Sequence, residues 1–352
     1  MAYTTINKPT EHFNTKLYTG DGTSSNAITG VGFAPDFVWS KARNGANAHI
    51  LVDKVRGATK VLHSSATTAE QTCNANQDTI SLDSDGFTVG TPTQFLGTNT
   101  NGRTVASWNW KANGAGSANT DGDINSTVSA NTTSGFSIVS YTGNGGSTPK
   151  TVGHGLGVAP KMIIIKPRNL TYDWMTYNEN VGATKGMCLN TTQAPFTSSN
   201  FNDTAPTTSV FSVKNNATNE TNGNYIAYCF AEKQGFSKFS SYIGNGNNDG
   251  TFVYTGFKPA FVLVKRTDAV ANWGLIDNTR DPFNVTYHFL EPNVSDAEFT
   301  PSGPQAAFDF CSQGFKCRST NGAINASGGT YIYMAFAEAP LVGSNNVPCT
   351  AR

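Results

Sequence analysis

Three short apolar runs, each just after a proline, dominate the pattern of hydrophobic and polar positions along the chain. They read DFVW, KMIIIK and AFVLVK, and they follow Pro35, Pro160 and Pro259. Each run is continuous and rich in β-branched or aromatic residues, which is typical of a strand covered on both faces. Because proline lacks an amide donor, it can begin a strand but does not fit inside a central one. The pattern therefore predicts three buried strands that each begin at a proline.

The segments around these runs are also alike in the three copies. Each copy opens with apolar residues that lead to an aromatic residue and a glycine-rich turn, and closes on an aromatic-rich strand. The closing strands are TVASWNWK (104–111), YIAYCFAE (225–232) and YIYMAFAE (331–338). Six to eight short strands fit in each copy, which is the size of a β-sandwich. We therefore predict an all-β chain of three tandem β-sandwich, jelly-roll-like repeats of about 100 residues each.

Composition gives the expected boundaries between these repeats. Residues 112–135 are rich in Gly, Ser, Asn and Thr, which favours a linker, whereas only KQG separates the second repeat from the third. We therefore expect the last two repeats to pack as a rigid pair, with the first free to be offset. The predicted parts are an arm (1–12), repeat 1 (13–111), a polar linker (112–135), repeat 2 (136–235), repeat 3 (236–339) and a strap (340–352).

The overall composition narrows the class of protein. Only 14% of the residues are charged, the 24 basic residues balance the 24 acidic ones, and no basic run is present, which argues against nucleic acid as a partner. No apolar stretch approaches the roughly 20 residues of a membrane span. The six cysteines lack the spacing of a zinc site, and no cofactor is expected.

Four longer phrases carry a family resemblance. The segments VGHGLGVAPKMIIIK, YIAYCFAEKQGFSKFSSYIGNG, TFVYTGFKPAFVLVKRTD and GGTYIYMAFAEAPLVGSNNVP come from the second and third repeats and the start of the strap, and the likeness covers essentially the whole chain. The chain resembles virion structural proteins of marine tailed bacteriophages (cyanophages and pelagiphages), in which an uncharacterised β domain recurs and is described as tail-fibre-like. The resemblance implies a place in the virion, after assembly in the bacterial cytoplasm, and contact with other virion proteins. It implies no catalytic residues.

Two roles follow from that resemblance. The first is a tail-fibre or receptor-binding component that recognises host-surface glycans, most simply as a homo-oligomer, with a trimer favoured. The alternative is a capsid decoration or other assembly subunit that does not touch the host. A receptor-binding part would lie on the tail, whereas a decoration subunit would lie on the capsid shell.

The residues that resemble catalytic or metal sites also have simpler explanations. His154 lies between glycines, but no G-x-S-x-G nucleophile accompanies it, so a structural turn is favoured. Glu232 and Glu338 end equivalent strands in different repeats, so a shared fold position explains them better than a glycosidase pair does. The DGD and DSDG segments at 121–123 and 83–86 lack the rest of a calcium loop. We therefore expect no enzyme.

Trp108 and Trp110 are the one candidate binding pair. Their i, i+2 spacing places both rings on one face of the last strand of the first repeat. If that face is exposed, the rings form a platform on which sugar rings could stack. If it is covered, they belong to the core.

Overall fold

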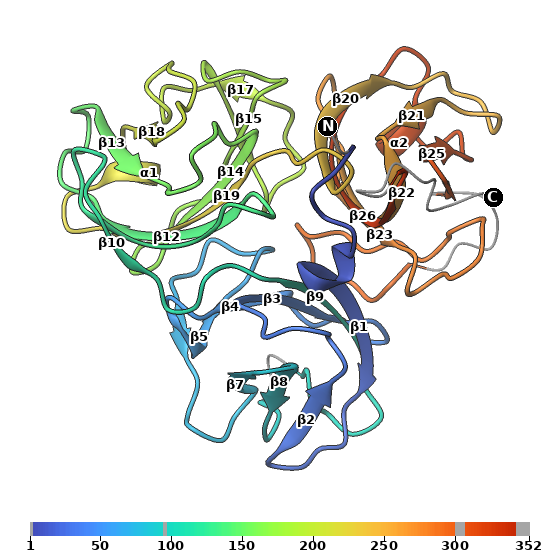
Figure 1. The fold of residues 1–352 in the computed structure, drawn as a ribbon, viewed down its shortest axis with the longest axis horizontal. Coiled ribbons are helices and arrows are strands. Elements are labelled where there is room, and N and C mark those ends of the chain that lie inside the picture. Colours follow the sequence, from blue (N-terminus) through green and yellow to red (C-terminus); the bar gives the residue numbers. More distant parts are fainter. Residues whose placement is uncertain (1–2, 94–96, 300–306, 343–352) are drawn as a thin grey trace.

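The computed structural model describes residues 3–93, 97–299 and 307–342. Over these ranges the regular structure is almost entirely β-strand, and the strands pair antiparallel in several sheets. This confirms the predicted all-β, sandwich-type class. The described helices are short, η1 (Pro9–Glu11), α1 (Asn216–Asn219) and α2 (Gly322–Asn325), and none is long and apolar enough to cross a membrane. Figure 1 shows three lobes around a common centre.

Each lobe contains a larger inner sheet and a smaller outer sheet. The first lobe is built from β1 (Phe13–Thr19), β2 (Asn26–Thr29), β3 (Phe37–Ala42), β4 (Ile50–Asp53), β5 (Gly57–Leu62), β6 (Gln71–Thr72), β7 (Thr79–Asp83), β8 (Gly86–Val89) and β9 (Thr104–Trp110). Its strands form a sheet of order β1-β9-β3-β4-β5-β6 and a sheet of order β2-β8-β7.

The second lobe has the longest sheet, of order β10-β11-β12-β19-β14-β15-β16-β17, with β13 and β18 paired outside it. Its strands are β10 (Ser117–Asn119), β11 (Ser126–Asn131), β12 (Phe136–Thr142), β13 (Lys150–Gly153), β14 (Met162–Pro167), β15 (Met175–Asn178), β16 (Lys185–Cys188), β17 (Phe196–Thr197), β18 (Val210–Val213) and β19 (Asn224–Phe230).

The third lobe pairs a sheet of order β20-β26-β22-β23 with a sheet of order β21-β25-β24. Its strands are β20 (Ser237–Ile243), β21 (Phe252–Tyr254), β22 (Phe257–Arg266), β23 (Trp273–Asp277), β24 (Phe308–Cys311), β25 (Gly314–Cys317) and β26 (Thr330–Pro340).

The same strand order recurs in the three inner sheets. The opening strand pairs with the closing strand, the closing strand with the strand after the proline, and that strand with the next, as in β1-β9-β3-β4, β12-β19-β14-β15 and β20-β26-β22-β23. Equivalent cross-strand pairs can therefore be matched between lobes. In the centre of each sheet these pairs are Trp39 with Trp108, Ile164 with Tyr228, and Leu263 with Met334.

The prolines begin their strands in two lobes but not in the third. β3 and β14 begin just after Pro35 and Pro160, as predicted. β22 already begins at Phe257, and its pairing with β26 shifts register on both sides of Pro259. A strand can hold a proline at such an irregularity because the ladder is interrupted there and needs no amide donor. The prediction of a strand start is therefore wrong at Pro259.

Residues 112–135 are not the predicted linker. They contain β10 and all of β11, and β11 pairs with β12 so that Val128 lies opposite Val139. Val128 and Ile124 are buried in the core of the second lobe. The composition was misleading because small polar residues can form a strand when a neighbouring strand satisfies their backbone groups.

The N-terminal arm is packed along the protein. Tyr3 donates a hydrogen bond of 2.7 Å from its hydroxyl to the carbonyl oxygen of Gly256 in the third lobe, and Ile6 is buried in the central core. The arm thus connects the third lobe to β1 of the first. The predicted strap begins at the last residue of β26, and its residues 343–352 lie outside the described part of the chain.

Every lobe has its own core and shares a second core with the other two. In β14, Met162 and Ile164 belong to the shared core, whereas Ile163 and Ile165 belong to the core of the second lobe. The strand is thus covered on both faces, as its continuous apolar sequence predicted. The shared core is rich in buried aromatic residues from all three lobes, among them Phe13, Phe37, Trp39, Trp108, Trp110, Phe136, Trp174, Tyr228, Phe230, Phe261, Trp273 and Phe336.

Hydrogen bonds between lobes hold the three lobes together in addition to the shared core. Trp174 Nε1 in the second lobe donates to the carbonyl oxygen of His63 in the first at 2.8 Å, and Trp273 Nε1 in the third donates to that of Cys188 in the second at 3.0 Å. The backbone amide of Glu298 in the third lobe donates to the carbonyl oxygen of Arg43 in the first at 2.7 Å. The first lobe is therefore bound to both others, and the expectation that it can be offset is wrong.

Candidate functional site

The tryptophan pair that we considered as a sugar platform is covered. Trp108 and Trp110 are 0% and 1% exposed, and both rings lie in the shared core. Trp108 Nε1 donates to Asp277 Oδ2 in the third lobe at 3.0 Å, and the Trp110 ring packs edge-on against Phe261 of the same lobe. The spacing correctly places both rings on one face, but that face is the surface on which the lobes meet. Of the two alternatives for this pair, the structure therefore places both rings in the core.

The other residues singled out in the sequence have partners that hold the fold. His154 is buried, its Nδ1 accepts from the Leu156 amide at 3.2 Å, and burial lowers its pKa. Glu232 pairs with Lys238 at 2.8 Å, and Glu338 pairs with Lys258 at 2.5 Å. Over the residues that the structure describes, no three His, Cys, Asp or Glu side chains lie close enough together to hold a metal ion.

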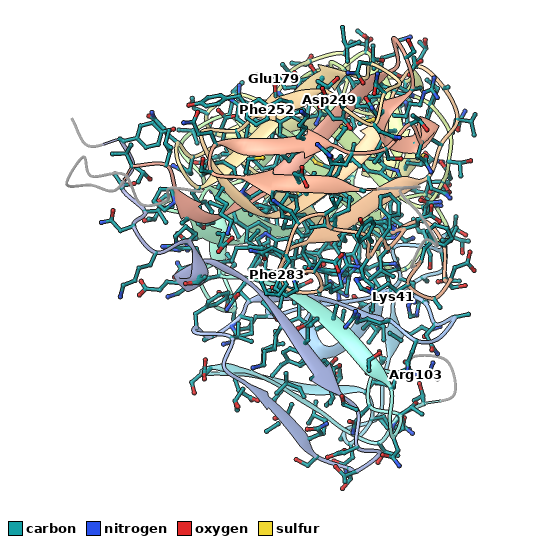
Figure 2. The ribbon with its side chains drawn as sticks, turned by 90° about the vertical axis from the view of Figure 1, so that its right-hand side faces the viewer. Lys41, Arg103, Glu179, Asp249, Phe252 and Phe283 are labelled. Carbon is teal, nitrogen blue, oxygen red and sulfur yellow. The ribbon has the colours of Figure 1, made fainter. Side chains whose placement is uncertain are left out.

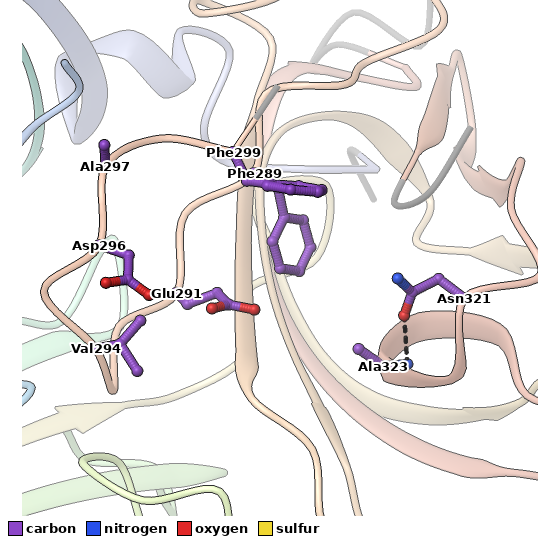
Figure 3. A pocket seen from close by; sticks show the side chains of 8 residues that line it. All are labelled: Phe289, Glu291, Val294, Asp296, Ala297, Phe299, Asn321 and Ala323. Atoms are coloured by element: carbon purple, nitrogen blue, oxygen red, sulfur yellow. Dashed lines mark hydrogen bonds between the residues drawn. The ribbon is translucent and has the colours of Figure 1, made fainter. Parts of the chain in front are cut away.

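A pocket of about 290 Å³ in the third lobe is the best candidate site. It lies between the segment that follows β23 and the turn that leads into α2, so that residues far apart in sequence face one another (Figure 3). The lining side chains combine aromatic, acidic and amide groups. They are Phe289, Glu291, Val294, Asp296, Ala297, Phe299, Asn321 and Ala323.

Two phenylalanines form the aromatic part of the pocket. Phe289 and Phe299 form an antiparallel β-bridge, with amide-to-carbonyl hydrogen bonds of 3.1 and 2.9 Å in the two directions. The Phe289 ring is buried above Gly274 of β23, where an added Cβ would lie only 2.1 Å from the ring. Phe299 is 48% exposed. The bridge thus orders the backbone at Phe299 and places one half-exposed aromatic side chain beside the pocket.

The carboxylates of Glu291 and Asp296 lie on the same side of the pocket (Figure 3). Burial raises the pKa of Glu291, a hydrogen bond from Asn272 partly offsets this, and the charge of Asp296 raises the pKa further. Across the pocket, Asn321 Oδ1 accepts a hydrogen bond of 2.7 Å from the Ala323 amide at the start of α2. That bond fixes the amide of Asn321, and its NH₂ group is turned toward the pocket (Figure 3).

Glu298 anchors the pocket segment to the first lobe. Its carboxylate accepts from Arg43 Nη2 at 2.7 Å and from Arg280 Nη1 at 2.9 Å, and its side chain is only 7% exposed. Glu298 lies between two lining residues in sequence, so these ion pairs hold the pocket in place. Interactions that lock the residues next to a binding site reduce the ordering that a ligand must impose.

One feature of the sequence points to this pocket. The third repeat departs from the other two at TRDPFN, just before the pocket segment, whereas RGATK and GATKG correspond in the first two repeats. The pocket residues themselves were missed because their aromatic and acidic types are common in loops. Only the tertiary structure brings the turn at Asn321 opposite Glu291.

The comparisons with known proteins give a family but no activity. The model of a family described as a domain of unknown function, DUF7483, matches residues 8–340. No match was found among the curated proteins or among the solved structures.

Proposed function

The chain belongs to the DUF7483 family, and we propose that it is a structural protein of a tailed-phage virion that binds host-surface glycans as a tail-fibre or receptor-binding component. In this proposal it acts by binding and not by catalysis. The pocket at Phe299 is the observation that carries the glycan-binding part. The place in the virion rests on the resemblance of the sequence to marine phage structural proteins.

The chemistry of the pocket suits a sugar. Proteins bind sugars through hydrogen bonds to the hydroxyl groups and through aromatic rings that pack on the apolar C–H face. Phe299 offers such a ring, Glu291 and Asp296 offer acceptors, and Asn321 offers a donor. A volume of about 290 Å³ corresponds to the lower end of small-molecule sites, so it suits one or two sugar units.

The rigid three-lobed body supports an adhesive role, but it would also suit the alternative, a capsid decoration subunit without host contact. The pocket favours recognition over decoration, since a subunit that only cements a shell needs no fixed polar cavity. Homotrimer formation and contact with other virion proteins remain part of the proposal. A trimer would have three times the 37.4 kDa mass of the chain, which light scattering measures directly.

Binding to a saccharide panel tests the proposal, with Phe299→Ala compared with Phe252→Ala. Phe252 is a matched control because it is 49% exposed, nearly the same as Phe299, and lies on the outer sheet of the third lobe (Figure 2). Loss of an aromatic stacking contact costs about 1 kcal/mol or more, so we expect affinity to fall at least about fivefold for Phe299→Ala only. Equal affinity of both variants and the unmodified protein, or no binding to any saccharide, contradicts the proposal.

The position in the virion needs a separate experiment. Antibodies against the purified chain, applied to intact phage particles and viewed by electron microscopy, should label the tail. Labelling of the capsid shell would favour the decoration alternative, and absence of label from disrupted and intact particles would overturn the virion assignment.

A further inference from the structure

We propose that the pocket prefers saccharides with a free amino group, such as glucosamine units, over neutral or acidic sugars. This inference rests on the proposed glycan binding and names the class of glycan. Its basis is the charge of the pocket wall. Of the eight side chains that line the pocket, Glu291 and Asp296 are the ones that carry charge, and both are acidic.

Basic groups around the pocket are occupied elsewhere. Arg266 donates to the carbonyl oxygen of Gly322 at 3.2 Å and pairs with Asp268. Arg43 and Arg280 both bind the Glu298 carboxylate, and Arg280 also binds Asp277. The Lys41 ammonium interacts with the charge of Asp296, but Lys41 is fully buried and its Nζ donates to the carbonyl oxygens of Ala42 and Gly45 at 2.7 and 3.1 Å. A ligand in the pocket therefore meets two carboxylates and no basic lining group.

The surroundings of Glu291 disfavour its ionised form. Burial and the charge of Asp296 both act against the ionised form of Glu291, and the hydrogen bond from Asn272 offsets them only in part. An ammonium group beside Glu291 and Asp296 would compensate both effects, because an opposite charge a few ångströms away favours the ionised carboxylate. A uronic acid or sulfated sugar would instead add a third negative charge. An N-acetylated sugar would bring no charge.

The aromatic ring and the acidic side chains have different roles: the ring contributes to binding of every sugar, and the acids distinguish between sugar classes. Phe299 can pack on any pyranose C–H face, so it supports binding of all sugar classes. The carboxylates decide between the classes, because the amino group is the difference between glucosamine and N-acetylglucosamine. Replacing the acids by their amides should therefore remove the preference and leave the shared contact in place.

Titration calorimetry with three soluble oligosaccharides tests this. The probes are fully deacetylated glucosamine oligomers, the corresponding N-acetylglucosamine oligomers and glucuronate-containing oligomers, at about pH 6. We expect the amine form to bind at least about tenfold more tightly than the N-acetylated form, and the glucuronate form to bind most weakly.

The variants Glu291→Gln and Asp296→Asn should each lower affinity for the amine form about tenfold and leave that for the N-acetylated form unchanged. Glu179→Gln is the control, because Glu179 has a half-exposed side chain on another lobe. Circular dichroism of each variant reports whether it is folded.

The outcomes separate the two proposals. Equal or tighter binding of the N-acetylated or acidic form, or an amine preference that survives in both amide variants, overturns the amine preference while glycan binding stands. Failure of all three classes to bind overturns the amine preference, and a wider panel that also fails overturns glycan binding.

Discussion

The phenol of Tyr228 in the second lobe donates a hydrogen bond of 2.8 Å to Oδ2 of Asp53 in the first lobe. Arg56 forms a salt bridge with the same Asp53 oxygen and donates to the Tyr228 oxygen at 3.1 Å. The side chains of Asp53 and Arg56 are both fully buried. One tyrosine hydroxyl therefore completes a buried ion pair of the neighbouring lobe.

Tyr228→Phe should destabilise the protein, because the variant removes this hydroxyl and leaves two buried charged groups with one partner fewer. We expect the free energy of unfolding to fall by about 1–3 kcal/mol, measured by urea denaturation. Tyr287→Phe is the control at a half-exposed site and should change stability by less than about 0.5 kcal/mol. Similar losses in both variants would mean that the bond across the lobes contributes nothing specific.

Arg280→Met should have a larger effect. Arg280 is buried between Asp277 at 2.6 Å and Glu298 at 2.9 Å, so its loss leaves the buried Asp277 carboxylate without its guanidinium partner, whereas Glu298 keeps Arg43. Breaking a buried ion pair in this way costs about 3–5 kcal/mol. Arg266→Met removes a more exposed arginine from its pair with Asp268 and should cost at most about 1 kcal/mol. If Arg280→Met lowers the free energy of unfolding no more than Arg266→Met does, the buried ion pair of Arg280 does not stabilise the fold as predicted.

The second lobe suggests how the buried pair can be replaced. Asn178 occupies the register position that Asp53 and Asp277 have in the other lobes, opposite the second residue after the proline. Val181 follows three residues later, where the others have arginine. We therefore expect Asp53→Asn with Arg56→Val to be more stable than Arg56→Val alone, as chemical denaturation can show. Arg56→Val alone leaves the buried carboxylate of Asp53 without its arginine partner, whereas the double variant removes both charges. If Arg56→Val alone is the more stable, the asparagine and valine of the second lobe do not stabilise the equivalent positions of the first lobe.

Three buried lysines should make stability rise at alkaline pH. Burial lowers the pKa of Lys41, Lys166 and Lys265 to about 8. In the unfolded chain a lysine titrates near pH 10.4, so from about pH 7 upward these three lysines bind more protons in the unfolded state than in the folded state. The free energy of unfolding then increases with pH. Denaturant titrations from pH 7 to 8 should show this increase. At higher pH the thiols of Cys73, Cys188, Cys229, Cys311 and Cys317, whose pKa burial raises in the folded protein, ionise first in the unfolded chain and oppose it, as tyrosines do near pH 10.

Lys166→Met provides the control for that pH dependence. Lys166 Nζ donates to the carbonyl oxygen of Thr67 in the first lobe at 2.9 Å, and methionine keeps a similar stem without the ammonium. The slope of stability against pH should be shallower in this variant. An unchanged slope would show that Lys166 is not among the groups that titrate.

Gly86→Ala should weaken the outer sheet of the first lobe. Gly86 has φ +143°, and a Cβ there would lie 1.9 Å from the carbonyl oxygen of Ile28 on the paired strand β2. We expect a loss of about 2 kcal/mol or more in thermal or urea unfolding. Gly57→Ala separates strain from collision, because Gly57 also has positive φ, +100°, but nothing within 4 Å of the added carbon. Gly57→Ala should therefore lower the free energy of unfolding less than Gly86→Ala does.

The strands could be predicted because neighbouring residues in the sequence determine them. The residues that cover each face of a sheet come from distant parts of the chain, so they could not be predicted in this way. The continuous run at Met162–Ile165 indicated two covered faces, and these prove to be two different cores. The spacing of Trp108 and Trp110 could not show that another lobe lies on them, since that depends on contacts between residues more than 150 positions apart, such as Trp108 with Asp277. The pocket was hidden for the same reason.

The closed ring of lobes also bears on how this chain can change over generations. In a ring of three identical chains, a mutation appears at all three positions at once, and each substitution must suit every interface. Here each interface is encoded separately, and they already differ: two have buried Asp–Arg pairs and the one between the second and third lobes has Asn178 and Val181 instead. The sequence of one lobe can therefore change under selection while the sequences of the other two lobes, and the contacts between them, stay the same.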